Sequence, residues 1–303
     1  MSTSPLPASR LRLAVGIATA GRPGIVGATV AELLRQDRPA DRIVVCAPSP
    51  TDVDALAANH PDVRVVIGPR GLPHQRNAIL RSLDGFDAVV FFDDDFVPCA
   101  DYLTEVEAIL IAHPEVAMTT GTVIKDGIIG PGLSFDEAKA RVAEAEGAPC
   151  PPFALAEVYN GYGCNMSVRL DPVRRHALAF DETLGSYAWL EDVDFSRQLA
   201  PYGRIVRATS TRGVHLGVKL GRQSGLRFGY SQIANPLYLV RKGHCTWRKA
   251  LHQMSRNIAI NVAKCLWPEP YVDRRGRLHG NLVAFADLLR GRLMPSRTLS
   301  LGS

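Results

Sequence analysis

Four short, largely apolar runs in the first third of the chain constrain its fold more than any other feature. They read LRLAVGIA, RIVVC, VRVVIG and DAVVFF and occupy residues 11–18, 42–46, 63–68 and 87–92. A run that shows no alternation of polar and apolar residues is typical of a strand buried on both faces. Helical patterns, each about as long as a crossover between parallel strands requires, separate the runs. The sequence therefore predicts an α/β fold, with a mostly parallel central sheet flanked by helices.

The regular alternation of apolar runs and helical patterns becomes weaker after residue 100. Residues 102–112 and 134–146 read as helices, and Ser134 and Glu137 match a capping box at the start of the second. Residues 116–124 and a segment near 205–208 read as further strands. A chain of 303 residues is long enough for one large domain or two, and either can bury a core.

Charge is divided unevenly along the chain, although the formal net charge is only +5. Residues 1–203 hold 17 Lys and Arg against 27 Asp and Glu, whereas residues 204–303 hold 18 against 3. The first part is thus an acidic body and the last third a basic surface, which could face nucleic acid, anionic lipid or a phosphorylated substrate. A hydrophobic content of 46% excludes intrinsic disorder.

Cysteine usage and hydropathy indicate the compartment. The six cysteines show no C-x-x-C spacing and lie among apolar neighbours, which predicts reduced interior thiols in a cytoplasmic protein. The first residues lack the apolar core and cleavage site of a secretory signal. No window approaches the ~20 apolar residues of a spanning helix, so we expect a soluble or peripheral protein.

Two basic, amphipathic segments lie near the end of the chain. Apolar residues recur at steps of three and four, at Leu251, Met254, Ile258, Val262 and Leu266, and again at Leu282, Phe285 and Leu289. These helices could lie on the inner leaflet of the cell membrane, attracted by anionic lipid, or could pack on the body with their charges in water. Nucleic-acid binding is the other use of such a basic surface, but no zinc-finger, RNP or helix-turn-helix signature accompanies it.

Three consecutive carboxylates follow the last of the four apolar runs, in FFDDDFVP. Ligands of open parallel sheets bind beyond the carboxyl ends of the strands. Asp93 and Asp95 point to the same side by the period of two, so together they can hold a hard divalent cation whose remaining positions take phosphate oxygens. The competing interpretation is a solvated acidic loop.

A second acidic group opens the helical pattern WLEDVDFSRQL. Glu191, Asp192 and Asp194 lie in its first turn, where the helix dipole favours negative charge. The functional alternative is that one of them is a general base that accepts the proton of an attacking sugar hydroxyl.

Seven motifs in order complete a resemblance: AVGIATAGRP, GLPHQRNAIL, FFDDDFVP, NGYGCNMSVRL, FDETLG, LEDVDFSRQL and IVRATSTRGVHL. Their succession, from about Leu13 to about Gly243, resembles the inverting family-2 glycosyltransferases of the GT-A fold. The resemblance implies a catalytic domain over residues 1–243 with a Rossmann-like nucleotide-binding half. Residues 244–303 would then form a basic helical C-terminal extension.

The resemblance also implies roles for the acidic motifs. Asp95, with Asp93 or Asp94, would bind Mn²⁺ or Mg²⁺ and the donor diphosphate, and His215 would complete the metal site. Asp192 matches the catalytic base of the family, with Glu191 beside it.

Further positions are implied for the donor and acceptor. Those assigned to the nucleotide are Thr19, Asp52, Arg76 and Asn77, and those assigned to the sugar and acceptor pocket are Asn165, Met166 and Trp189. The loop after the second strand departs from the family pattern, and Asp52 is only the nearest acidic residue to the one expected there. We therefore expect a UDP-sugar as donor, with GDP as the alternative.

The expected reaction is a single in-line displacement, in which Asp192 deprotonates the acceptor hydroxyl and the anomeric centre inverts. The acceptor would be a glycan or a polyprenyl-diphosphate-linked saccharide in exopolysaccharide or cell-envelope assembly, met at the inner face of the membrane. The rival enzyme class is a sugar-1-phosphate nucleotidyltransferase, but its G-x-G-x-R loop does not match ATAGRPG. A P-loop kinase is excluded because G-x-x-x-x-G-K-[ST] does not occur.

Overall fold

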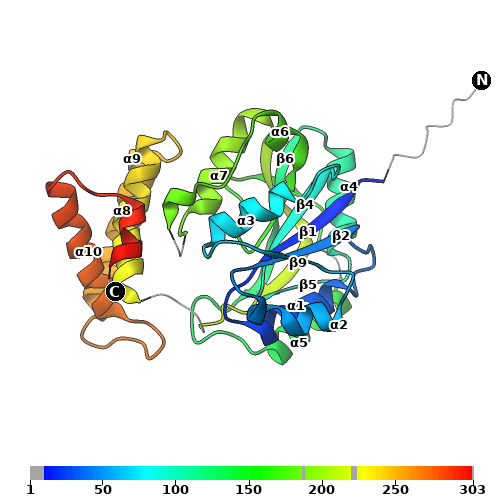
Figure 1. Ribbon diagram of the computed structural model, residues 1–303, viewed down its shortest axis with the longest axis horizontal. Coiled ribbons are helices and arrows are strands. Elements are labelled where there is room, and N and C mark those ends of the chain that lie inside the picture. Colours follow the sequence, from blue (N-terminus) through cyan, green and yellow to red (C-terminus); the bar gives the residue numbers. More distant parts are fainter. Residues whose placement is uncertain (1–9, 150, 186–187, 220–223, 302–303) are drawn as a thin grey trace, which may run out of the picture.

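A mixed sheet runs through the body of the protein (Figure 1). The computed structural model describes residues 10–149, 151–185, 188–219 and 224–301. The strand order is β3-β2-β1-β4-β8-β6-β9-β5, and β7 pairs with β9. The strands are β1 (Leu13–Ala18), β2 (Arg42–Ala47), β3 (Arg64–Ile67), β4 (Ala88–Asp93), β5 (Phe96–Pro98), β6 (Val116–Asp126), β7 (Leu155–Glu157), β8 (Asn165–Arg169) and β9 (Arg204–His215).

The four apolar runs form the parallel half of this sheet, as the sequence predicts. Strands β3, β2, β1 and β4 are parallel to one another. Beyond β4 the pairings are antiparallel, apart from the parallel pair β6–β9. The α/β class is thus confirmed, and the parallel character is concentrated in the half that the resemblance assigns to the nucleotide.

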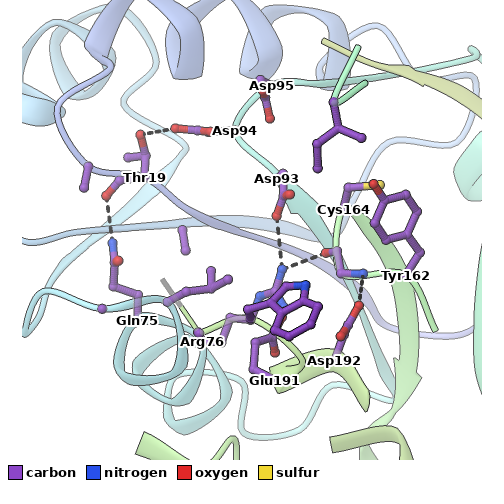
Figure 2. A pocket seen from close by; sticks show the side chains of 18 of the residues that line it. Thr19, Gln75, Arg76, Asp93, Asp94, Asp95, Tyr162, Cys164, Glu191 and Asp192 are labelled. Carbon is purple, nitrogen blue, oxygen red and sulfur yellow. Dashed lines mark hydrogen bonds and ion pairs between the residues drawn. The ribbon is translucent and has the colours of Figure 1, made fainter. Parts of the chain in front are cut away.

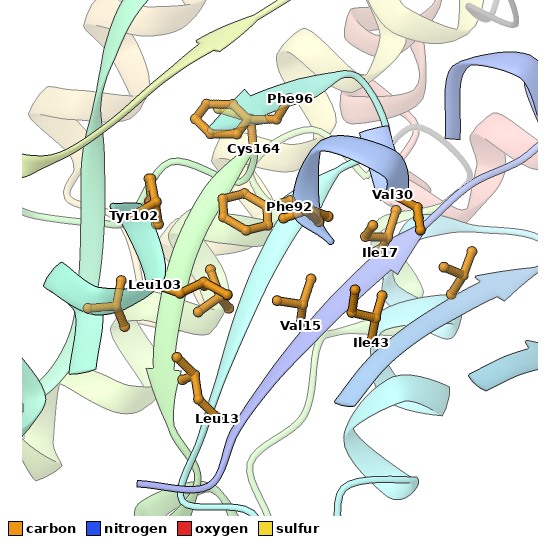
Figure 3. Packing of buried hydrophobic residues seen from close by; sticks show 14 of the residues in the cluster. Leu13, Val15, Ile17, Val30, Ile43, Phe92, Phe96, Tyr102, Leu103 and Cys164 are labelled. Carbon is orange, nitrogen blue, oxygen red and sulfur yellow. The ribbon is translucent and has the colours of Figure 1, made fainter. Parts of the chain in front are cut away.

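Helices cover both faces of the sheet. Successive residues of β1 alternate between the two sides, so that Leu13, Val15 and Ile17 face one apolar core and Ala14 the other (Figure 3). The first core is covered by α1 (Pro23–Leu33), α2 (Asp54–Asn59) and α4 (Tyr102–Ala112). The second is covered by α3 (Leu72–Arg81), α6 (Leu170–Arg175) and α7 (Glu191–Leu199).

The structure agrees with the sequence-based prediction where the local signal is strong and differs from it where the signal is weak. The helix at 102–112 is found with the predicted bounds, and α5 (Phe135–Gly147) has the predicted capping box between Ser134 and Glu137. The final strand is longer than expected, because β9 continues through the polar residues TSTRGVH. Its neighbours β5, β6 and β7 supply the backbone pairing that overrides this polar sequence.

Three long helices stand beside the α/β body, with α10 on the outer side (Figure 1). They are α8 (Gly225–Arg241), α9 (Trp247–Lys264) and α10 (Arg274–Leu289). A small apolar core that includes Tyr230, Met254 and Ala284 joins them. The last helix begins earlier than the amphipathic pattern suggested, because Asp273 caps it by accepting from the Gly276 N–H (2.8 Å). No helix in the described ranges is both long and apolar enough to cross a membrane.

The cysteines agree with the sequence analysis as far as they are described. Cys46, Cys99, Cys164 and Cys245 are buried, Cys265 is half-buried, and all five are free thiols. Cys150 lies outside the described residues.

Two glycines allow α8 and α10 to approach each other closely. A Cβ atom on Gly280 would collide with the Leu226 carbonyl oxygen, and one on Gly229 would collide with that of Arg277. Because these obstacles are backbone atoms of helices, no side-chain rotation can relieve the clash.

We expect Gly280→Ala to push the two helices apart and lower the free energy of unfolding by about 1–3 kcal/mol. Gly27→Ala in α1 is the matched control, because its Cβ would meet nothing within 4 Å. That substitution should be neutral or stabilising by up to about 1 kcal/mol through helix propensity. Chemical denaturation followed by circular dichroism measures both, and equal effects of the two substitutions would contradict the close packing of α8 on α10.

Candidate active site

A cavity of about 770 Å³ lies beyond the carboxyl ends of β1 and β4 (Figure 2). Its walls come from the ends of these strands, the start of α3, the start of α7 and the end of β9. Arg227 of α8 and Gln253 of α9 also line it, so the helical part of the chain contributes to the cavity. A ligand position at this edge is the one that an open parallel sheet favours.

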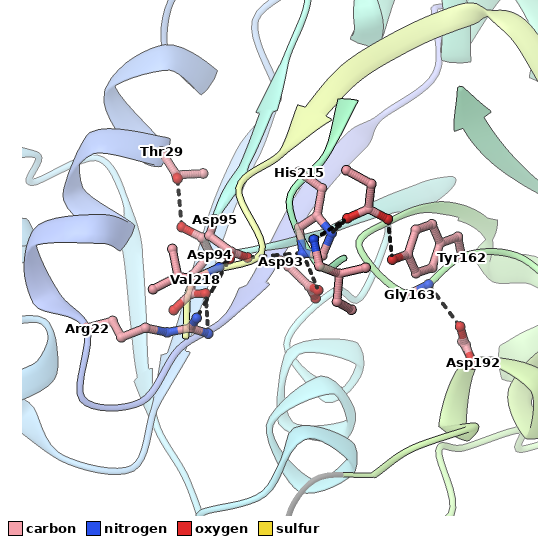
Figure 4. Close-up of polar contacts among 12 residues, drawn as sticks. Arg22, Thr29, Asp93, Asp94, Asp95, Tyr162, Gly163, Asp192, His215 and Val218 are labelled. Carbon is pink, nitrogen blue, oxygen red and sulfur yellow. Dashed lines mark hydrogen bonds and ion pairs between the residues drawn. The ribbon is translucent and has the colours of Figure 1, made fainter. Parts of the chain in front are cut away.

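The three consecutive aspartates point in different directions (Figure 4). Asp94 is fully buried, accepts from the Thr19 hydroxyl (2.6 Å) and pairs with Arg22 (2.6 Å). Burial raises the pKa of Asp94 to about 7, against the opposing effect of Arg22. Asp94 therefore fastens the strand end to the loop after β1, whereas its two neighbours turn toward His215.

Asp93, Asp95 and His215 form a candidate metal centre. One ligand atom from each lies within 4.8 Å of the others. His215 Nε2 is 3.5 Å from Asp95 Oδ1 and 3.9 Å from Asp93 Oδ2. The second oxygen of Asp95 accepts from the Val218 N–H (2.8 Å), which orients the carboxylate. Of the two alternatives that the sequence left open, Asp93 lies in the cluster with Asp95.

Asp126 contacts His215 at the ring nitrogen that faces away from Asp93 and Asp95. The Nδ1 of His215 lies 2.9 Å from Asp126 Oδ1, and Tyr162 donates its hydroxyl proton to the other oxygen of Asp126 (2.9 Å). Burial lowers the pKa of His215, but the bonds to Asp126 and Asp95 outweigh it and raise this pKa to about 10. An imidazole oriented by a carboxylate on the far nitrogen is the usual arrangement of a metal-ligating histidine. The cluster therefore fits a divalent cation, through two hard oxygen ligands and one nitrogen.

The three carboxylates at the start of α7 also have different partners. Asp192 is half-buried in the cavity wall, where its Oδ2 accepts from the Gly163 N–H (3.1 Å). Burial raises its pKa, although this N–H and that of Val193 oppose the shift. Asp194 is fully buried on the far side, paired with Lys242 and His244 (2.7 Å each). Asp194 thus links α7 to the end of α8, whereas Asp192 lines the cavity.

Glu191 belongs to a buried ionic bridge centred on Arg76. The guanidinium is 1% exposed, pairs with Glu191, and donates to Asp93 Oδ1 (3.1 Å) and the Gly163 carbonyl (2.6 Å). It also lies over the rings of Phe91 and Phe180, at 5.6 and 5.5 Å from their centroids. Burial raises the pKa of Glu191 to about 8, against the effect of Arg76. The bridge ties the metal cluster, the loop at Gly163 and the start of α7 together.

Most of the residues assigned from the sequence line the cavity. These are Thr19, Arg76, Asp93, Asp94, Asp95, Trp189, Glu191, Asp192 and His215. Four others do not. The Asn77 side-chain amide is engaged with the Phe180 backbone (2.9 Å for each bond), and Met166 is buried in the second core. Asn165 is buried beneath the cavity on Thr120 (2.8 Å), and Asp52 accepts from the Gly21 N–H (2.9 Å) behind its rim.

Sequence reasoning missed several residues that hold the site. Arg22 and Gly163 lie within quoted motifs, but nothing in their spacing showed that one pairs with Asp94 and the other with Asp192. Asp126 ends β6, two residues beyond the strand predicted at 116–124, and carries no motif at all. Arg227 and Gln253 could not be found, because their position depends on how the last helices pack on the body.

The comparisons with known proteins agree with this fold. Residues 10–126 match the family described as "Glycosyltransferase like family 2". The mannosyltransferase PcManGT from Pyrobaculum calidifontis, solved with GDP-Man and Mn²⁺, has a similar structure at 18% identity, with a TM-score of 0.56 over 98% of this chain and 87% of that one. Residues 1–349 of S. aureus TarS match at 14% identity and a TM-score of 0.56, over 96% and 83% of the two chains. No curated protein has significant sequence similarity to the chain.

The fold of this chain is thus the one found in these solved glycosyltransferases. The family match covers residues 10–126, the segment that ends with Asp126 and contains the three consecutive aspartates.

We expect Arg76→Met to lower the free energy of unfolding by about 3–5 kcal/mol, because it leaves the carboxylate of Glu191 buried without its cation. Adding Glu191→Leu should recover part of this loss, since the second charge is then removed too. Arg35→Met is the control: its pair with Glu32 is exposed and 3.7 Å long, and its loss should cost less than about 1 kcal/mol. Urea denaturation measures all three, and a double variant less stable than Arg76→Met would contradict the bridge.

Proposed function

We propose that the enzyme is a metal-dependent, inverting transferase that moves the sugar of a nucleoside diphosphate sugar to an acceptor hydroxyl. One observation supports this most directly: the half-buried carboxylate of Asp192 and the cluster of Asp93, Asp95 and His215 line the same cavity. A base for the acceptor and a cation site for the leaving group are the two parts that such a displacement needs.

Asp192 acts as the general base. It accepts the proton of the acceptor hydroxyl while that oxygen forms a bond to the anomeric carbon of the donor. The bond from this carbon to the diphosphate oxygen breaks on the opposite side, its electron pair leaves with the nucleoside diphosphate, and the configuration inverts. The Gly163 N–H holds the carboxylate in place (3.1 Å), and Arg76 fixes Gly163 through the carbonyl of the same residue (2.6 Å). We assign proton transfer to Asp192. Glu191 has a supporting role, because its pair with Arg76 holds the start of α7 in place.

Asp93, Asp95 and His215 would hold Mn²⁺ or Mg²⁺. When bound, the cation supplies the positive charge that stabilises the departing diphosphate. Arg22 lies beside the same carboxylates, 3.8 Å from Asp95, and adds a fixed positive charge at this end of the cavity. The Mn²⁺ found with PcManGT supports this choice of cofactor.

The nucleoside would lie at the β1 end of the cavity, near Thr19 and the loop that Asp52 supports. We keep UDP as the expected nucleotide, and the GDP-Man of PcManGT keeps GDP as the alternative. Asn77, Asn165 and Met166 lie behind the cavity wall, so we propose that they shape the site without touching the donor or acceptor. A thermal-shift comparison of UDP- and GDP-sugars with Mn²⁺ decides the nucleotide.

The acceptor would enter where Trp189, Arg227 and Gln253 line the cavity. We propose a glycan or a polyprenyl-diphosphate-linked saccharide of the cell envelope, met at the inner face of the membrane. Residues 244–303 are proposed as the extension that brings the enzyme there. The nucleotidyltransferase and nucleic-acid alternatives gain no support from the family match, which covers a transferase domain.

We expect Asp192→Asn to lower kcat by about 10²–10⁴-fold and to leave donor affinity little changed, because only proton transfer is removed. Release of the nucleoside diphosphate from UDP- and GDP-sugars, with water or a glycan as acceptor, measures the rate. Asp136→Asn, an exposed carboxylate of α5, is the control and should have no effect.

The pH profile gives a second readout of Asp192. A base must be ionised to accept a proton, so kcat/KM should fall as the pH drops through the pKa of Asp192. Because burial raises that pKa, the acid limb should lie above the ordinary aspartate range. Near-normal turnover by Asp192→Asn would assign the base elsewhere.

We expect Mn²⁺ to bind the wild-type protein in the presence of UDP, and Asp95→Asn or His215→Gln to abolish or strongly weaken this binding. Asp126→Asn removes only the orientation of His215 and should weaken it by about 10–100-fold. Isothermal titration calorimetry measures the affinities, again with Asp136→Asn as the control. Unchanged Mn²⁺ affinity in His215→Gln would place the metal elsewhere.

A further inference from the structure

Helices α9 and α10, together with the turn that follows α9, expose large apolar side chains to solvent. We name this surface the α9–α10 face. Seven residues make it up, with exposed fractions from 37% to 89%: Leu251, Val262, Leu266, Trp267, Leu282, Phe285 and Leu289. Single exposed apolar residues are ordinary, but an exposed row on each of two packed helices marks an interaction surface.

Helical periodicity places these residues on the side away from the core. In α9 Leu251 and Val262 are eleven residues apart, a step that returns to one face, whereas Met254 and Asn261 face the other helices. Leu266 and Trp267 follow in the turn after the helix ends at Lys264. In α10 Leu282, Phe285 and Leu289 follow at steps of three and four. The two rows meet at a shallow groove of about 380 Å³ lined by Cys265, Leu266, Arg275, Leu278, His279 and Leu282.

Positive charge surrounds the apolar rows. Residues 244–303 hold ten Lys and Arg against three Asp and Glu. Several of these cations are neutralised within the helices, as Arg274 is by Glu269 (2.9 Å). Arg248, Arg256, Arg275 and Arg290 are exposed, and none has a carboxylate partner within the described residues. Arg275 lies at the start of α10, and Arg290 directly follows its last residue. The two arginines therefore border the apolar row of α10 at both ends.

We infer that the α9–α10 face docks on an anionic lipid surface. Apolar side chains would enter the boundary between headgroups and acyl chains, the arginines would meet lipid phosphates, and Trp267, which is 81% exposed, would lie at the interface that tryptophan prefers. A second copy of the chain is the rival occupant. A two-fold contact would oppose this face to itself and bring the same unpaired arginines together, which charge repulsion disfavours.

What membrane docking would do for catalysis rests on the proposed function. Gln253, which lines the catalytic cavity, lies in α9 two residues from Leu251. The two side chains lie on nearly opposite sides of the helix, so docking through Leu251 would leave the cavity about one helix diameter, roughly 10 Å, from the lipid surface. A lipid-linked acceptor could then reach Asp192 with its sugar while its lipid part stays in the bilayer.

The test is co-sedimentation of the full chain with vesicles of phosphatidylcholine alone, and of phosphatidylcholine with an equal amount of phosphatidylglycerol. We expect binding to the anionic vesicles only, weakened at about 0.5 M NaCl because salt screens the lipid charge. Leu282→Gln with Leu289→Gln should lower the partition coefficient at least roughly tenfold, since each leucine contributes apolar burial. Arg275→Gln with Arg290→Gln should lower it by about 25-fold, at about fivefold for each charge.

Leu34→Gln with Ile67→Gln is the matched control, because these side chains are 47% and 51% exposed on the α/β body. It should bind like the wild type. All variants change exposed positions, and equal thermal denaturation midpoints confirm that they fold.

Three results would overturn the inference: no binding to anionic vesicles, equal binding by the Leu282/Leu289 variant, or a wild-type dimer that this variant converts to monomers without any vesicle binding. Each leaves donor turnover by the soluble protein intact, so a failure of docking is separate from a failure of the transferase. Conversely, an inactive protein that still binds anionic vesicles would count against the proposed reaction alone.

Discussion

The buried guanidinium of Arg76 is the interaction on which the arrangement of the site depends. One cation lies between Glu191 at the start of α7, Asp93 at the end of β4 and the carbonyl of Gly163. A charge this deeply buried is stable only when its partners are all in place. The position of α7 relative to the sheet, and with it the distance of Asp192 from the metal cluster, is therefore fixed by ionic bonds as well as by apolar packing.

The same bridge explains how so many carboxylates can share one cavity. Asp93, Asp94, Asp95, Glu191 and Asp192 all line it. Arg22 pairs with Asp94, Arg76 with Glu191 and Asp93, and His215 approaches Asp95 and Asp93, so four of the five acids have a cation close by. Asp192 is held instead by the N–H groups of Gly163 and Val193, and no ion pair joins it to a side chain within the described residues. A carboxylate oriented in this way suits the general base that we propose.

The parts that sequence could predict are those governed by local pattern. The apolar runs, the helix at 102–112 and the capping box at Ser134 need only their own residues to be recognised, and each is found. The acidic motifs were recognised too, but the partners of each carboxylate were not, because Asp94 and Asp194 differ from their neighbours only in what the folded chain places beside them. Asn77 shows the same limit: a side chain in a recognised motif is engaged by the backbone of Phe180, 103 residues away. Long-range contacts of this kind leave no trace in local spacing.

Strand β9 connects the register of the sheet with the geometry of the candidate metal centre. Its pairing with β6 contains shifts of register between Thr120 and Thr122 and between Val123 and Lys125, and the strand ends at His215 opposite Asp126. Because side chains alternate across a strand, one residue more or less in these irregularities would turn His215 to the opposite face and Asp95 would lose its neighbour. The irregularities of this interior pairing thus set the relative positions of the residues in the candidate metal centre. In the divergence of such a domain, an insertion or deletion in β6 or β9 would disturb the candidate metal centre while leaving the parallel half of the sheet intact.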